Sequence, residues 1–267
     1  MKKQPLYHYT FFVFSVLILF SCSDDNGKPD EGPDEPGNTI TQAEFDATLG
    51  DHTRFSVDVS NQEVDPGPSG SGVSWDFSKF DNPFSSNFQE ALNCPDTEGC
   101  DVFPEANRAF LLHGDIDSYS YFTLSKNEYL RIGGINDDIQ TTMNDPETVW
   151  KFPIAYQQEF SDDYHETGSN GEITTATKDI EVDGYGTLTT AAGTFSNTLR
   201  VKMSYTVVVD YPDPLIPQTQ TNLVQYIWLN KNYAGGLLLG VLFSETKVNG
   251  EAVGIGKGLY YTDPEPL

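Results

Sequence analysis

The sequence predicts an all-β protein whose strands form either a strongly curved antiparallel sheet or a two-layer β-sandwich, with one short helix near the N-terminus. Aromatic residues make up 13% of the chain, which also contains 23 glycines and 16 prolines, a composition typical of many short strands joined by turns. Short segments that alternate apolar and polar residues recur along the chain. Helices and strands do not alternate as they do in a parallel α/β sheet, and no repeat of roughly 20–50 residues is visible.

The chain is strongly acidic, because 40 aspartates and glutamates outnumber 15 lysines and arginines and give a formal charge of −25. Nucleic acids and anionic lipid surfaces require basic patches, so we expect neither to be the main partner. Two interpretations of the acids stay open: they keep a protein soluble outside the cell, or some of them bind calcium.

Residues 1–21 have the pattern of a signal peptide. Lys2 and Lys3 precede an apolar core at residues 11–20, which is too short to cross a bilayer, because a spanning helix needs about 20 residues. The core runs into Leu19-Phe20-Ser21-Cys22, which resembles the lipobox of bacterial lipoproteins. The resemblance implies cleavage before Cys22 and attachment of acyl chains such as palmitate to this residue. An ordinary secretory signal with an incidental Cys22 is the alternative.

The segment after Cys22 is acidic and rich in proline and glycine. It contains no large apolar side chain up to residue 39, so we predict a disordered tether over residues 22–39 and a single β-rich domain over residues 40–267. The acids next to Cys22 resemble the surface-export signal of Bacteroidota lipoproteins. This resemblance implies a protein anchored in the outer membrane and facing the cell exterior, with the periplasmic face as the alternative.

The domain is predicted to begin with one helix, and its other regular elements are predicted to be strands. Thr41 and Glu44 form the pattern of a capping box and predict a helix at residues 42–49. Alternation predicts strands that lie at residues 55–59, 73–77, 118–124, 128–132, 172–183, 185–189, 198–210, 223–229, 237–246 and 254–261. We expect irregular structure at residues 78–107, a loop at residues 133–138, a break at Pro153 and a polar turn at residues 161–171.

Two segments predict tight hairpins. In residues 183–202 the turn falls at residues 190–193, and Phe195, Leu199, Val201 and Met203 are expected on one face of the return strand. The Asn249-Gly250 pair predicts a second turn, since both residues adopt positive φ readily. In the strand before residue 183 a bulge or twist is expected, because Ile173 differs in parity from Ile180 and Val182.

The run Gly184-Tyr-Gly-Thr-Leu-Thr-Thr-Ala-Ala-Gly-Thr-Phe-Ser-Asn-Thr-Leu-Arg-Val201 resembles one in uncharacterised secreted and lipid-anchored proteins of Bacteroidota. Trp75-Asp-Phe-Ser78, the aromatic segment 119–124 and Tyr226-Ile-Trp228 belong to the same pattern, so the resemblance covers about residues 70–260. The family brings no assigned activity. The hairpin also resembles curved lipoproteins of the lipoprotein-carrier type, which wrap a sheet around a helix or an apolar ligand.

The residues that could carry chemistry do not form a recognisable catalytic motif. His8, His52, His113 and His165 have no metal-ligand spacing, and we expect no cofactor. Cys94 and Cys100 are expected to form a disulfide, as in other exported proteins. Weak calcium candidates are the acids of two predicted loops, namely Asp96, Glu98, Asp101, Asp137 and Asp138.

The aromatic side chains are the other candidates for a site. Most should belong to the core, but a group that faces solvent together could stack against a ligand, and the candidates are Trp75, Tyr121, Trp150 and Trp228. The leading hypothesis is therefore a non-catalytic binding module for an extracellular glycan, an apolar ligand or an envelope protein. A structural or assembly component of the outer membrane is the alternative, and a secreted hydrolase acting on glycans comes third.

Overall fold

The computed structural model describes residues 39–114, 116–233, 235–263 and 267, and the protein is nearly all β, with 64% of residues in strands. The first half of the domain contains β1 (Thr39–Ile40), α1 (Gln42–Thr48), β2 (His52–Val57), β3 (Gly70–Asp76), β4 (Pro83–Leu92), two 3-10 turns (Cys94–Asp96 and Glu98–Asp101), β5 (Arg108–Leu112), β6 (Ser118–Leu124) and β7 (Glu128–Asn136). The second half contains β8 (Ile139–Lys151), β9 (Ile154–Ala155), β10 (Glu159–Gly168), β11 (Ile173–Thr190), β12 (Gly193–Asp210), β13 (Thr219–Leu229), β14 (Leu237–Val248) and β15 (Glu251–Thr262).

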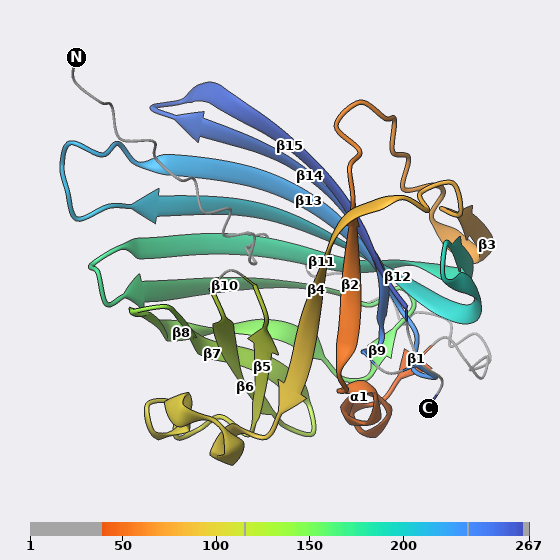
Figure 1. Ribbon diagram of the computed structural model, residues 1–267, viewed down its shortest axis with the longest axis horizontal. Helices are drawn as coiled ribbons and strands as arrows, with labels where there is room; N and C mark the ends of the chain where they lie inside the picture. Colours follow the sequence, from red (N-terminus) through yellow and green to blue (C-terminus); the bar gives the residue numbers. More distant parts are fainter. Residues whose placement is uncertain (1–38, 115, 234, 264–266) are drawn as a thin grey trace, which may run out of the picture.

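The predicted strongly curved antiparallel sheet is confirmed, and its curvature is enough to close it. The strands follow the order β10-β8-β7-β6-β5-β4-β2-β15-β14-β13-β12-β11, and β10 also pairs with β11. The result is a closed sheet of twelve strands, a barrel. β3 lies outside this ring and pairs in parallel with β11, while β1 and β9 form a separate two-stranded ladder. Figure 1 shows β11–β15 as the longer wall and β4–β7 as the shorter one.

The predicted capping box is present at the start of α1. The Thr41 hydroxyl accepts a hydrogen bond from the Glu44 backbone N–H, and the Glu44 carboxylate accepts one from the Thr41 backbone N–H. Two ion pairs attach α1 to the rest of the domain, from Arg108 of β5 to Asp46 and from Lys231, in the connection after β13, to Glu44. The helix therefore sits fixed at one end of the closed sheet (Figure 1).

Both predicted hairpin turns are present. Asn249 and Gly250 connect β14 to β15 and have φ values of 52° and 83°, the positive region that this residue pair tolerates. In the hairpin of β11 and β12 the register slips between Gly186 and Leu188. Phe195 consequently packs in a different cluster from Leu199, Val201 and Met203, so the prediction of one shared face was wrong for Phe195. The register also slips between Glu181 and Gly184, whereas the strand from Ile173 to Glu181 is regular and leaves Ile173 exposed.

Four strands of the closed sheet were missed, namely β4, β5, β8 and β10. β4 lies in the segment expected to be irregular, and β10 replaces most of the predicted polar turn. β7 continues to Asn136, through most of the loop predicted at residues 133–138. β10 contains Asp162, Asp163 and Glu166, and side chains of this kind are depleted in strands. Its pairing with both β8 and β11 closes the sheet, and contacts that are distant in sequence outweigh the local preference.

The apolar side chains are divided between the two faces of the closed sheet. The inner cluster includes Phe122, Trp150 and Ile227 together with Phe45 of α1. A second cluster packs Trp75 and Phe77, from the segment that contains β3, against Trp228. A third lies beneath the 3-10 turns and includes Cys94, Phe103 and Tyr121. Two excursions of the chain therefore cover apolar parts of the outer face.

The glycines of the Gly184-Tyr-Gly186 run have a packing role in the second cluster. A Cβ at Gly186 would overlap the backbone carbonyl of Val73 on β3, and a Cβ at Gly184 would lie 2.7 Å from the Trp75 ring. β3 pairs with β11 over this stretch. The glycines thus allow β3 and Trp75 to approach the sheet closely.

Candidate functional site

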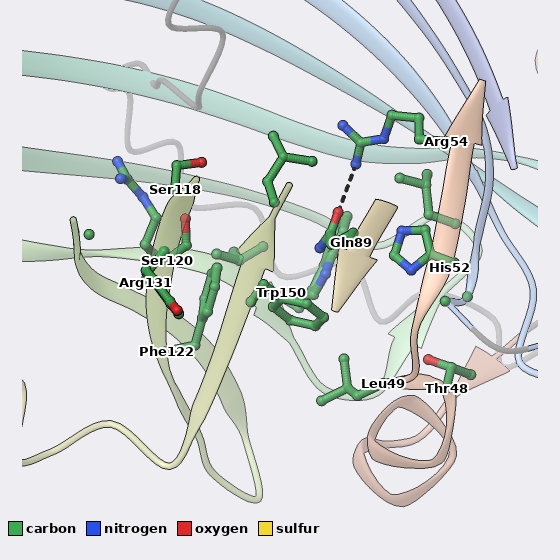
Figure 2. Close-up of a pocket in the computed structure, with 18 of the residues that line it drawn as sticks. Thr48, Leu49, His52, Arg54, Gln89, Ser118, Ser120, Phe122, Arg131 and Trp150 are labelled. Carbon is green, nitrogen blue, oxygen red and sulfur yellow. Dashed lines mark hydrogen bonds between the residues drawn. The ribbon is translucent and has the colours of Figure 1, made fainter. Parts of the chain in front are cut away.

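A cavity of about 620 Å³ lies inside the closed sheet, bounded at one end by α1. This volume falls within the range of about 300–1,000 Å³ that is typical of small-ligand sites. The apolar side chains that line it come from α1 and from both walls of the sheet, and include Phe45, Leu49, Phe110, Phe122, Trp150, Ile227 and Leu229. Figure 2 shows how the wall residues surround the space.

The sheet register orders the lining residues from a closed end to an open end. Near α1, Tyr129 pairs with Leu124 and Trp150, and all three are buried. The Phe45 ring of α1 lies 5.1 Å from the Tyr129 ring. Farther along the same strands, one row of paired residues is partly exposed and consists of Gln89, Leu112, Ser118 and Asn136. Ile116, in the turn beyond this row, is 55% exposed. The cavity is therefore apolar at its closed end and opens beside this turn.

Three polar side chains that line the cavity lie together on the neighbouring strands β2 and β4. His52 pairs directly with Gln89, and Arg54 follows two residues later on the same face of β2. The Arg54 guanidinium donates to the Gln89 side-chain oxygen at 3.3 Å and lies 4.4 Å from the centre of the Tyr260 ring. Figure 2 shows Arg54 and His52 extending from β2 toward Gln89.

His52 is buried and has one unused ring nitrogen. Its Nδ1 lies 3.1 Å from the Gly50 carbonyl oxygen, and its Nε2 has no hydrogen-bond partner among the described residues. Burial lowers the pKa of the imidazole below its usual value of 6.5, and the nearby Arg54 charge acts in the same direction. A neutral ring that donates from Nδ1 to Gly50 presents an Nε2 that can accept a hydrogen bond.

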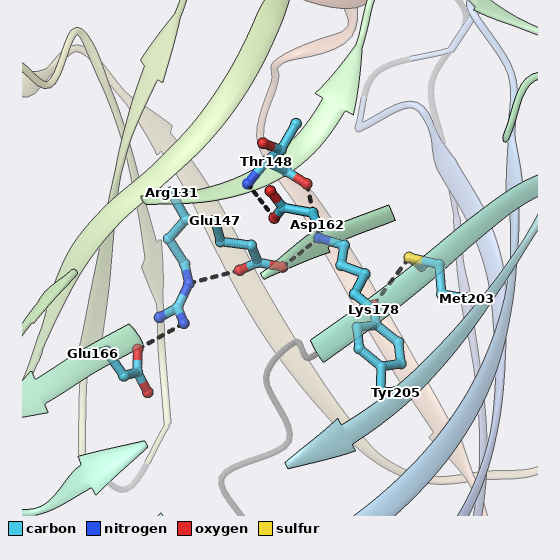
Figure 3. A network of polar contacts seen from close by, with 8 residues as sticks. All are labelled: Arg131, Glu147, Thr148, Asp162, Glu166, Lys178, Met203 and Tyr205. Carbon is cyan, nitrogen blue, oxygen red and sulfur yellow. Dashed lines mark hydrogen bonds and ion pairs between the residues drawn. The ribbon is translucent and has the colours of Figure 1, made fainter. Parts of the chain in front are cut away.

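A buried ionic network occupies the wall on the opposite side of the ring of strands, where β7, β8, β10 and β11 meet (Figure 3). The Glu147 carboxylate receives hydrogen bonds from Arg131 at 3.0 Å and from Lys178 at 2.7 Å, and Arg131 also pairs with Glu166 at 2.8 Å. Burial by itself would raise the pKa of Glu147, but the charges of Lys178 and Arg131 outweigh it and hold the pKa below its usual value.

The same network replaces missing sheet hydrogen bonds. The ladder between β8 and β10 stops at the pair of Asp145 and His165. Beyond it the Thr148 N–H donates to the Asp162 carboxylate at 2.8 Å, and the Thr148 carbonyl accepts from the Lys178 ammonium at 2.8 Å. Side chains thus satisfy backbone groups at the seam where the two strands separate.

The four aromatic candidates from the sequence are not brought together. Trp150 lines the cavity. Trp75 and Trp228 are buried against each other in the cluster on the outer face, with their ring centres 5.9 Å apart. Tyr121 is buried beneath the 3-10 turns, stacked on Phe103. Three of the four are therefore core residues, and only Trp150 is placed to contact a ligand inside the sheet.

The remaining candidates fall outside the cavity. The Sγ atoms of Cys94 and Cys100 lie 2.18 Å apart, which supports the predicted disulfide. Asp96, Asp101, Asp137 and Asp138 are exposed, and in the described part of the chain no group of three or more His, Cys, Asp or Glu residues is arranged to hold a metal ion. Cys22, the predicted lipidation site, lies outside the described residues.

The polar residues at the mouth were not identified from the sequence. Arg54 and His52 do alternate with Thr53 and Phe55, but this pattern is shared by solvent-facing strand residues. Gln89 lies in a strand that was not predicted. Their meeting depends on the pairing of β2 with β4.

Comparison of the chain with protein-family models, with curated proteins and with solved structures finds no match. Within the described ranges, no helix combines the length and the apolar character needed to span a membrane. The cavity is therefore the main evidence for a function.

Proposed function

We propose that the protein is a non-catalytic binding module of the cell envelope that holds a small, largely apolar molecule inside its closed sheet. The observation that carries this proposal is the cavity of about 620 Å³, which is apolar near α1 and polar at its mouth. Such a combination of an apolar wall with a few converging polar groups is typical of small-molecule sites. Of the sequence hypotheses, it favours an apolar ligand over a glycan or a protein partner.

The groups inside the cavity argue for binding over hydrolysis. Among the described residues that line it, Glu147 is the carboxylate, and it is neutralised by Arg131 and Lys178. A glycoside hydrolase of the common type needs two carboxyl groups that flank the scissile bond and are available for proton transfer or attack. A glutamate held in two ion pairs with a lowered pKa is a poor proton donor.

The binding proposal is tested by titrating the purified full-length protein, stripped of bound lipid on a hydrophobic resin, with the neutral fluorescent probe N-phenyl-1-naphthylamine. We expect saturable binding with fluorescence enhancement. A non-fluorescent apolar ligand at 100 times its dissociation constant should raise the melting temperature by about 5–11 °C, since it adds about 2.7 kcal/mol to a domain of this size.

A cavity-filling variant ties the probe to this site. Ser120→Phe places a ring in the cavity, because Ser120 lines it from β6. Ser196→Phe is the matched control, since Ser196 is exposed at a distance in β12. We expect Ser120→Phe to reduce probe binding and Ser196→Phe to leave it unchanged. Equal binding by both variants, or no binding by the unmodified protein, would contradict the proposal.

For the location, we propose attachment to the outer membrane through acylated Cys22, with the binding domain facing the cell exterior. The lipobox-like residues 19–22 and the acids that follow support this proposal. The periplasmic face is the alternative. Protease added to intact cells distinguishes the two faces, because it degrades the domain in the first case and leaves it intact in the second.

A structural role in the envelope is the second candidate, and exposed apolar side chains favour it. Leu215, between β12 and β13, is 87% exposed, and Ile255 and Val253, both on β15, are 88% and 61% exposed. Such residues are often found where a protein meets a partner. Substitution of all three by serine should release the protein from an envelope complex under this alternative, and should leave ligand binding unaffected under the leading proposal.

A further inference from the structure

We infer that the molecule held in the cavity is an amphiphile with an anionic head, a carboxylate or a phosphate, which Arg54 receives at the mouth while the apolar tail points toward α1. This inference rests on the proposed binding function and specifies its ligand. The new element is the charge of the ligand's head group, because the apolar lining residues select only for an apolar tail.

Arg54 differs from the other arginines in having no carboxylate partner. The chain contains four arginines, and all of them lie in the described ranges. Arg108 pairs with Asp46, Arg131 with Glu147 and Glu166, and Arg200 with Asp183. No described carboxylate lies within ion-pair distance of Arg54, and its Nε is buried without a hydrogen-bond partner.

A buried guanidinium donor without a partner is costly, because desolvation removes its contacts with water. The Gln89 oxygen and the Tyr260 ring satisfy only part of the Arg54 side chain. An oxyanion at the mouth would accept from the remaining donors, and the fork of guanidinium N–H groups matches a carboxylate or a phosphate.

The surroundings of Arg54 favour an anion in this place. The charged lining residues are Arg54, Arg131 and Glu147, and the last two are paired with each other. Asp51, three residues before Arg54, uses its carboxylate to accept a hydrogen bond from the Ala91 backbone N–H. Because the whole chain has a formal charge of −25, Arg54 is not part of a general basic surface.

The polar and apolar ends of the cavity fix the orientation of the ligand. Arg54 lies one step beyond the row of Gln89, Leu112 and Ser118, on the open side, and Phe45 and Trp150 lie at the closed side. His52 lies two residues earlier on the same face of β2, about 7 Å from Arg54 along the strand and nearer to α1, and its Nε2 can accept a hydrogen bond from a hydroxyl group of the ligand. A head at Arg54 leaves the tail against the aromatic end.

The test compares four ten-carbon ligands at pH 7.5 and below their micelle concentrations, by displacement of N-phenyl-1-naphthylamine from the full-length protein. The ligands are decanoate, decyl phosphate, decanol and decyltrimethylammonium. We expect at least one anion to bind about 10–100-fold more tightly than decanol, because a hydrogen bond to a charged group lowers the dissociation constant by about this factor. The ratio of decanoate to decyl phosphate then distinguishes a fatty acid from a phosphate head.

Arg54→Gln should abolish this preference, and Arg54→Lys should restore part of it. Lys126→Gln is the control, since it removes the same charge from an exposed turn. Equal binding of anions and decanol by the unmodified protein would overturn the inference and leave the binding function standing. An Arg54→Gln variant that keeps the full preference for anions over decanol would do the same. Displacement by none of the ligands, together with no binding of the probe, would overturn both. If Arg54→Gln does not fold, the ratio of the affinities for anions and for decanol in the unmodified protein tests the inference by itself.

Discussion

At the scale of single residues, Lys178 stabilises the fold by neutralising the buried charge of Glu147. Its ammonium contacts the Glu147 carboxylate and the Thr148 carbonyl, and both Lys178 and Glu147 have side chains that are 1% exposed. Removal of one partner from such a pair leaves a buried charge and an unsatisfied carbonyl.

We expect Lys178→Met to lower the free energy of unfolding by about 3–5 kcal/mol. Urea denaturation followed by tryptophan fluorescence measures this change. Lys202→Met is the matched control, because Lys202 forms a partly exposed pair with Glu181 at 3.5 Å and should cost at most about 1 kcal/mol. Equal effects of the two substitutions would show that the network does not carry the expected energy.

His52 gives the protein a pH dependence of defined sign. Its pKa is below 6.5 in the folded state, so the unfolded chain binds a proton at a higher pH than the folded chain does. The contribution of His52 is therefore complete above pH 6.5 and is lost as the pH falls from 6.5 toward the lower folded pKa.

The measurement is the difference in unfolding free energy between the unmodified protein and His52→Asn from pH 7.5 to pH 5.5. We expect the advantage of histidine over asparagine to shrink as the pH falls. His165→Asn, on β10, serves as the comparison. A difference that stays constant or grows toward low pH would refute the assignment.

At the scale of elements, the packing of β3 on β11 depends on the absence of a side chain at Gly186. An alanine Cβ there would overlap the Val73 carbonyl, and this backbone atom cannot rotate away as a side chain can. We expect Gly186→Ala to cost about 1–3 kcal/mol, the usual range for overpacking. Gly254→Ala is the control, because no atom lies within 4 Å of the position of its Cβ. Thermal unfolding measures the stability of both variants, and equal melting temperatures of Gly186→Ala and Gly254→Ala would contradict the packing role.

Some elements could be predicted from local sequence patterns, and others could not. The capping box of α1 and the Asn249-Gly250 turn were predictable, because each is set by a few adjacent residues. β10 was not, since its acids are unfavourable in an isolated strand and find partners only in the folded sheet, Glu166 at Arg131 and Asp162 at the Thr148 N–H. The buried aromatic residues were correctly expected to be numerous, but their division between an inner and an outer face follows from closure of the sheet.

At the scale of the whole molecule, the site could not be predicted, because it is formed by closure. Arg54 and Gln89 are 35 residues apart in sequence, and the cavity between them and Trp150 exists only when β10 pairs with β11. The overall class, an all-β domain with a strongly curved sheet, was nevertheless within reach. Composition and strand alternation are properties of the chain as a whole, and they do not require the correct pairing.

The predicted anchor is also tested on the whole molecule. Cys22→Ala should prevent incorporation of labelled palmitate and release the protein from the membrane fraction, because the acyl chains predicted on Cys22 would provide most of the membrane affinity. Ser21→Ala serves as a control for changes close to the cleavage position. Retention of the label by Cys22→Ala would contradict lipidation at this residue.

The apolar clusters outside the closed sheet have a consequence for how this scaffold can be altered. Trp75, Trp228 and Tyr121 bury their surface away from the cavity, so a large part of the packing does not depend on the residues that would contact a ligand. Inner-wall positions such as Ser118, Ser120 and Leu112 can therefore be exchanged in combination while the outer layers hold the strands in register. Under the proposed function, much of the packing that maintains the shape would then be separate from the wall that selects a ligand, which would make the molecule a suitable starting point for libraries of new receptors.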